Sequence, residues 1–321
     1  MTSHHEPATT ALRPAAPTPA AVPATPAAPI PAVPEATPVS AHERALRAVA
    51  NAGEPTADFG SRTPYDVYVG ASVLHGLQHP VTPQPQEMAF LVISQVMELY
   101  FGLLCYEWRT AQGELRADRA AHATRSLRRS VHHLRALNAS WDSLGWLTPM
   151  EFNSFRDELG QASGFQSAMY RHVEFLLGNK SAAMIRPHKS DPDVSAGLTA
   201  ALAEPSVYDE VLALLARRGY PVPAAVLERD PTTEYLPSPE VEAAWVAVYR
   251  DGLPDGELFF LAETLTDIAQ EFTVWRHQHL LSVRRSLGAK AGSGGSSGLR
   301  WLEKSLAREV FPELWSARTQ I

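Results

Sequence analysis

The sequence predicts an all-α protein in which one large helical domain follows a Pro/Ala-rich N-terminal tail. From about Asp58 to the C-terminus apolar residues recur at helical spacing, and no segment shows the period-2 alternation of a strand. Residues 1–40 hold 10 of the 26 prolines, and such a segment buries too little apolar surface to offset its ordering entropy. We therefore expect a disordered tail at 1–40, a short helix and linker at 41–57, and a domain of about ten helices at 58–321.

Composition narrows the classes of function. The chain has 321 residues, of which 45% are hydrophobic, and a net charge of −7. This charge argues against nucleic acid or an anionic membrane as a constant partner. No apolar stretch approaches the ~20 residues of a membrane span, and no secretory signal is recognised at the N-terminus. Cys105 is the single cysteine, so no disulfide forms within the chain. We expect a cytoplasmic protein.

A helix expected from Pro85 to about Arg109 presents one inward face, because its apolar positions recur at i, i+4, i+7, i+11 and i+15. Ser94 carries the only hydroxyl on this face. A serine in a helix commonly bonds the carbonyl one turn back; alternatively, Ser94 is a small polar group facing a cofactor. The residues of the face are Phe90, Ser94, Met97, Phe101 and Cys105.

A short, well-delimited helix is predicted within 148–160, where a capping box, a proline at the first position and a terminal glycine coincide. Arg156 lies on its apolar face, beside Phe152 and Phe155. A guanidinium in apolar surroundings needs an anion, because an unpaired buried charge is costly. The partner is either a structural carboxylate, such as Glu174, or the carboxylate of a ligand held by a bidentate fork.

A long helix is predicted from about Glu257 to Leu287, and His279 lies on its apolar stripe. His277 is about 200° around the helix and faces elsewhere. A lone histidine on such a face is either a hydrogen-bonded core residue or a proximal haem ligand. No second histidine or carboxylate follows at i+4, which argues against zinc. The stripe consists of Leu265, Ile268, Phe272, Trp275, His279, Val283 and Leu287.

The run from Gly292 to Gly298, here called the Gly/Ser loop, contains only glycine and serine. Composition alone favours a flexible linker. A loop whose backbone amides and hydroxyls bind the ionic groups of a ligand is the alternative.

Together these segments resemble the tryptophan 2,3-dioxygenase family, within the wider superfamily of haem-dependent aromatic oxygenases. The resemblance extends from about Thr63 to the C-terminus, with the matching strings in the family's order and spacing. The strings are 87–95, 155–157, 163–167, 174–180, 275–279 and the Gly/Ser loop.

The resemblance implies a helical, homotetrameric enzyme that binds haem b and oxidises the indole of tryptophan with O2. His279 matches the proximal iron ligand, and Ser163, Gly164 and Trp275 match positions beside the haem.

The same resemblance implies a set of substrate contacts. Arg156 matches the residue that binds the amino-acid carboxylate, and Ser293 stands where the family has a threonine that contacts the ammonium and carboxylate. Phe90 matches a residue that packs on the indole. Tyr65 and Tyr68 match tyrosines that a neighbouring subunit contributes to the pocket.

Three pocket positions depart from the family pattern. Ser94 replaces a distal histidine that bonds the indole N–H, Phe152 replaces a tyrosine, and Tyr100 replaces a tryptophan. These departures favour a specialised-metabolism variant that inserts one oxygen atom and forms a 2-oxindole from tryptophan or a substituted tryptophan. Ordinary dioxygenation to N-formylkynurenine is the alternative, followed by a haem-dependent hydroxylase of phenols such as tyrosine and by a non-catalytic haem sensor.

Overall fold

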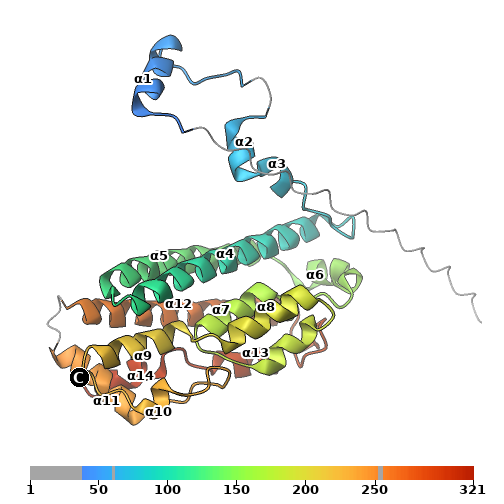
Figure 1. Cartoon of the computed structure of the whole chain (residues 1–321). Coiled ribbons are helices and arrows are strands. Elements are labelled where there is room, and N and C mark those ends of the chain that lie inside the picture. The colour runs from blue at the N-terminus through green and yellow to red at the C-terminus, as the bar shows by residue number, and fades with distance from the viewer. Residues whose placement is uncertain (1–37, 60–61, 252–255) are drawn as a thin grey trace, which may run out of the picture. The chain divides into compact units, whose positions relative to one another are not determined.

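The computed structural model describes residues 38–59, 62–251 and 256–321. Most of the segment expected to be disordered, 1–37, lies outside these ranges. Within them the chain forms α-helices and short 3₁₀ helices and no strand, which confirms the all-α prediction (Figure 1). The elements are α1 (Ala41–Ala50), α2 (Pro64–Val69), α3 (Ala71–Leu74), α4 (Pro85–Arg116), α5 (Ala120–Ala139), η1 (Ser140–Ser143), α6 (Pro149–Arg156), η2 (Asp157–Leu159), η3 (Gly164–Gln166), α7 (Ala168–Leu176), η4 (Ala182–His188), α8 (Pro192–Ala203), α9 (Val207–Arg217), α10 (Ala224–Leu227), α11 (Pro239–Asp251), α12 (Glu257–Ser286), α13 (Leu299–Leu306), α14 (Pro312–Ser316) and η5 (Ala317–Thr319).

The chain divides into two compact units, the first ending at Gly76 and the second running from Leu77 to Ile321. The division falls inside the segment 58–321 that the sequence analysis treats as one domain. Helices α1, α2 and α3 belong to the first unit, and none of their residues is buried. Helix α1 begins at a capping box in which Ser40 and Glu43 bond each other's backbone N–H.

Three long helices, α4, α5 and α12, form the framework of the second unit, with α5 packed against both of the others. Their inward faces are apolar at helical spacing, as the sequence predicts. On α4 this face includes Phe101, Leu104 and Trp108, all buried. The buried indole N–H of Trp108 donates to the Ser130 hydroxyl of α5 over 2.9 Å, so the close packing of the two helices leaves that donor satisfied.

Helix α4 corrects one expectation. By length and composition it could cross a membrane, whereas the sequence analysis expected no stretch of that kind. The same helix supplies core residues to the second unit and packs on α5, α7 and α9. A core helix of a globular protein meets the same criterion, so the finding is weak support for a membrane span.

The shorter helices build around this framework. Helix α6 packs against both α4 and α12, α7 packs on α4, and α13 packs on α12. The described residues contain more helices than the ten expected, because α3, α10 and α14 are only four or five residues long. Elements of that length are too short to show a 3.6-residue period.

The three helices predicted to carry the site are confirmed. Helix α4 begins at Pro85 as expected and runs to Arg116, seven residues beyond the expected end. Helix α6 starts at the expected capping box of Thr148 and Glu151. It continues as the 3₁₀ turn η2 to Leu159, and Gly160 ends it with a φ of +60°. Helix α12 ends at Ser286, one residue before the expected end.

Candidate functional site

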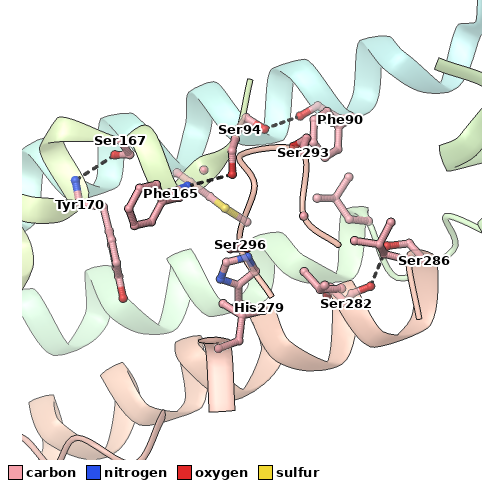
Figure 2. Close-up of a pocket in the computed structure, with 18 of the residues that line it drawn as sticks. Phe90, Ser94, Phe165, Ser167, Tyr170, His279, Ser282, Ser286, Ser293 and Ser296 are labelled. Atoms are coloured by element: carbon pink, nitrogen blue, oxygen red, sulfur yellow. Dashed lines mark hydrogen bonds between the residues drawn. The ribbon is translucent and has the colours of Figure 1, made fainter. Parts of the chain in front are cut away.

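A pocket in the second unit lies among α4, α6, α7, α12, α13 and the Gly/Ser loop, and most of its wall is apolar. It brings together nearly all the site residues predicted from the sequence, from Phe90 to Ser293 (Figure 2). The predicted residues that line it are Phe90, Ser94, Phe152, Arg156, Ser163, Gly164, Trp275, His279 and Ser293.

His279 projects from α12 into this pocket (Figure 2). Burial lowers the pKa of its imidazole to about 4, so the ring is neutral near pH 7 and keeps a lone pair for a ligand. Neither ring nitrogen bonds another described residue, which argues against the hydrogen-bonded core histidine that the sequence left open. His277 is exposed, as its position around the helix predicts.

Trp141, which was not predicted from the sequence, lies in the 3₁₀ turn η1 and lines the pocket. Its indole stacks on the imidazole of His279, with ring centroids 5.3 Å apart and planes at 18°. Trp275 contacts the same imidazole in a tilted arrangement at 5.4 Å. No sequence signal marks Trp141, because η1 is too short to have a period and the tryptophan stands in no motif.

Three phenylalanines form an aromatic wall between α4 and α6. Phe90 contacts Phe152 and Phe155 at centroid distances of 5.8 and 5.6 Å, and the latter two contact each other at 5.5 Å. Tilted and edge-on pairs of this kind are favourable beyond the area they bury. Phe90 and Phe152 face the pocket and offer apolar ring surface to a planar ligand, and the buried Phe155 supports both from behind.

Ser94 forms the local bond that the sequence favours and also lines the pocket, while its role toward a cofactor stays a prediction. Its hydroxyl donates to the carbonyl of Phe90, one turn back, over 2.8 Å, and the residue also lines the pocket (Figure 2). Because the hydroxyl proton is used in this bond, the oxygen offers lone pairs to the pocket. Ser94 can therefore accept a hydrogen bond from a ligand N–H.

The structural partner considered for Arg156 is wrong. Glu174 is buried and instead pairs with Arg171 and, at 3.6 Å, with Arg276. The Nη2 atom of Arg156 donates to the carbonyl of Ala291 over 2.6 Å, and Arg156 forms no ion pair with any described residue. A partly buried guanidinium that lines the pocket without an anion fits the carboxylate-binding alternative.

The Gly/Ser loop has a defined conformation that depends on glycine. A Cβ atom on Gly298, whose φ is +61°, would lie 2.7 Å from the carbonyl oxygen of Lys290. One on Gly294 would lie 2.9 Å from the Cβ of Ser163. The Ser293 hydroxyl donates to the carbonyl of Ala162 over 2.7 Å. The loop is thus a packed part of the pocket, and the linker interpretation is wrong.

Tyr65 and Tyr68 lie on α2 in the first unit, where 69% and 84% of their surfaces are exposed. Their proposed contact with the pocket of a neighbouring subunit stays a prediction. Tyr100, the third departure from the family pattern, packs against the core without lining the pocket.

The residues of the pocket fit a haem held through one protein ligand. His279 offers a neutral imidazole that forms no hydrogen bond with a described residue, inside walls that are mostly apolar. The described residues contain no group of three or more histidine, cysteine, aspartate or glutamate side chains that could hold a bare metal ion. Iron in a haem needs only an axial ligand from the protein, because the porphyrin supplies the other four.

Comparison with known proteins gives one consistent result. A family model described as tryptophan 2,3-dioxygenase matches residues 50–321. The chain is 42% identical over 264 residues to the tryptophan 2,3-dioxygenase of Polaromonas naphthalenivorans, covering 82% of this chain and 94% of the relative. It is 40% identical over 274 residues to that of Bordetella pertussis, covering 85% and 96%.

Proposed function

The chain belongs to the tryptophan 2,3-dioxygenase family, and from this membership we propose that it is a haem-dependent enzyme that uses O2 to oxidise the indole ring of tryptophan. The observation that carries the proposal is geometric: the imidazole of His279 faces a mostly apolar pocket and forms no hydrogen bond with a described residue. The expectation of a specialised, 2-oxindole-forming variant finds no support among the relatives, which are named as dioxygenases and so favour insertion of both atoms. We therefore propose cleavage of the C2–C3 bond to N-formylkynurenine.

In this proposal His279 would bind the haem iron, and Trp275, Ser163 and Gly164 would help to hold the haem. Haem supplies the redox chemistry that allows dioxygen to react with a closed-shell indole. The protein orients the substrate and keeps water out of the pocket. The apolar wall excludes water from the reacting centre, which limits the loss of reactive oxygen species.

The amino-acid end of tryptophan binds at Arg156 and Ser293. The guanidinium of Arg156 forms a bidentate ion pair with the carboxylate. The indole packs on the aromatic wall of Phe90 and Phe152, and Ser94 accepts a hydrogen bond from its N–H. Fixing both ends of the substrate holds C2 and C3 in one orientation, and such positioning accounts for a large share of many enzymes' rate enhancements.

We also propose a cytoplasmic homotetramer, with neither nucleic acid nor a membrane as a partner. Two observations support assembly. The short helices α2 and α3 bury none of their residues, and α4 exposes 63% of Leu99 and 68% of Tyr106. Large apolar side chains exposed together in this way mark interaction surfaces. Tyr65 and Tyr68 would then complete the pocket of a neighbouring subunit.

Mass spectrometry of the product formed from tryptophan under ¹⁸O-labelled dioxygen tests the proposal. The haem-loaded, reduced protein should form a product that carries two labelled atoms. A product with one labelled atom would establish monooxygenation instead. Turnover of tyrosine without turnover of tryptophan would establish a phenol hydroxylase, and ligand-dependent spectra without any product would establish a sensor.

A further inference from the structure

We infer that Trp141 is the positioning residue that fixes the plane of the His279 imidazole, and that ring stacking does here what a hydrogen bond does at most histidine ligands. The inference rests on the proposed role of His279 as the iron ligand. It concerns a residue that neither the family resemblance nor the relatives' names assign.

The stack joins two separate elements. Trp141 belongs to η1, which follows α5, whereas His279 belongs to α12. Their rings are 18° from parallel with centroids 5.3 Å apart. Trp275 also contacts the imidazole, but it lies one turn earlier on the same helix and its ring is tilted by 52°. Trp141 is thus the contact that ties the orientation of the imidazole to a neighbouring helix.

The imidazole has no other described restraint on its plane. Histidine ligands in metal sites usually donate their second ring N–H to a carboxylate or carbonyl, which fixes the ring. No described residue forms a hydrogen bond or ion pair with His279, and the χ2 torsion of histidine is intrinsically broad. A near-parallel neighbouring ring narrows that torsion, because rotation of the imidazole would drive its edge into the indole face.

The indole N–H of Trp141 is buried and bonds none of the described residues. An unpaired buried donor destabilises a fold, and phenylalanine at this place would avoid that cost. Phenylalanine would supply a smaller ring face, and the wide face of the indole is what stacks on His279.

The test compares three haem-loaded variants with the wild type. Trp141→Leu removes the ring, and Trp141→Phe keeps a smaller ring without the N–H. Trp301→Leu is the matched control, because Trp301 also lines the pocket but contacts Phe165 edge-on and touches no ring of His279. The measurements are the iron–histidine stretching band of the ferrous protein by resonance Raman and the rate of haem transfer to apomyoglobin.

We expect Trp141→Leu to shift or broaden the iron–histidine band and to speed haem loss about tenfold, the order expected for a lost stacked pair. Trp141→Phe should keep a narrow band, with haem loss within about threefold of wild type. Trp301→Leu should leave the band unchanged even if it weakens haem binding. An unchanged band in Trp141→Leu would overturn the inference.

If the leucine variant does not fold, Trp141→Met replaces it in the test, because the long unbranched side chain of methionine fills irregular core space. The iron–histidine band is then measured in that variant. A failure of the proposed function can be distinguished from a failure of the inference about Trp141. Haem spectra that are unchanged in His279→Ala would show that His279 is not the ligand. Loss of haem in His279→Ala together with an unaltered band in Trp141→Leu would overturn only the role of Trp141.

Discussion

Arg156 and Ala291 are joined by a 2.6 Å hydrogen bond from the guanidinium Nη2 atom to the backbone carbonyl. The bond links α6 to the start of the Gly/Ser loop. It leaves the other guanidinium N–H groups without a carboxylate among the described residues. The side chain is therefore held in place in the pocket while its charge stays available to a ligand.

Replacement of Arg156 by leucine should weaken the binding of tryptophan far more than that of indole. Loss of a charge-assisted pair costs on the order of 2–4 kcal/mol, roughly 30- to 1000-fold in affinity. Spectral titration of the haem protein with both compounds measures the ratio. An unchanged ratio would make Arg156 a structural residue that only braces Ala291.

The two histidines of α12 should behave differently when each is changed to alanine. His279→Ala should lose the Soret band or bind haem poorly, because His279 faces the pocket. His277→Ala should keep the band, because that side chain is exposed. Absorption spectra of the reconstituted proteins decide this, and equal loss of haem in both variants would contradict the assignment.

Ser94→Ala should retain much of the activity, because a neutral hydrogen bond contributes only about 1 kcal/mol, less than tenfold in rate. Ser94→His should shift preference toward unsubstituted tryptophan and away from 1-methyltryptophan, which lacks the indole N–H. The values of kcat/KM for both substrates test this. An inactive Ser94→Ala protein with intact haem would give the hydroxyl a direct catalytic role.

Gly298→Ala should destabilise the protein and weaken tryptophan binding, since the new Cβ would meet the Lys290 carbonyl at 2.7 Å. A strained backbone of this kind costs about 1–3 kcal/mol. Gly295→Ala is the matched control, because Gly295 also has a positive φ but nothing lies within 4 Å of its added Cβ. Denaturant unfolding compares them, and equal losses would mean that backbone strain alone, without the clash, sets the cost.

Lys180 should make stability depend on pH. Its ammonium donates to the carbonyls of Ala201, Leu202 and Glu204 at the end of α8, and burial lowers its pKa from 10.5 to about 8. The cost of burying the charge is present in full below pH 8 and disappears as pH rises to 10.5, where the unfolded lysine also loses its proton.

Between pH 8 and 10.5 the unfolded state therefore binds more protons at this site, and the free energy of unfolding should rise. Lys180→Met removes this contribution. The difference in unfolding free energy, wild type minus Lys180→Met, should increase from pH 8 to 10.5 in denaturant titrations. A difference that stays flat or falls would contradict the altered pKa.

Periodicity and capping residues were sufficient to predict the helices that carry the site. The stripe that includes His279 lies on a helix of the predicted length, and Thr148 caps α6 as its spacing from Glu151 indicates. Local patterns of this kind are encoded within a few residues. For the same reason the four-residue helices, such as α3, escaped prediction.

Contacts between distant segments could not be predicted from spacing. Glu174 and Arg156 are 18 residues apart and looked like partners, but the fold gives Glu174 to Arg171 and Arg276. Trp141 could be found only once η1 and α12 were placed together. Burial of His279 and its neutral state likewise depend on packing that a one-dimensional pattern does not contain.

The aromatic wall of Phe90, Phe152 and Phe155 has a consequence for local opening of the protein. These rings are contacts through which α6 docks on α4, and Arg156 is on the same short helix. If α6 separates from α4, the guanidinium of Arg156 and two rings of the aromatic wall, Phe152 and Phe155, move away from α4 in a single event. Amide hydrogen exchange along α6 would then proceed by one cooperative opening. The exchange rate would report how often Arg156 and the Phe152 ring leave the pocket together.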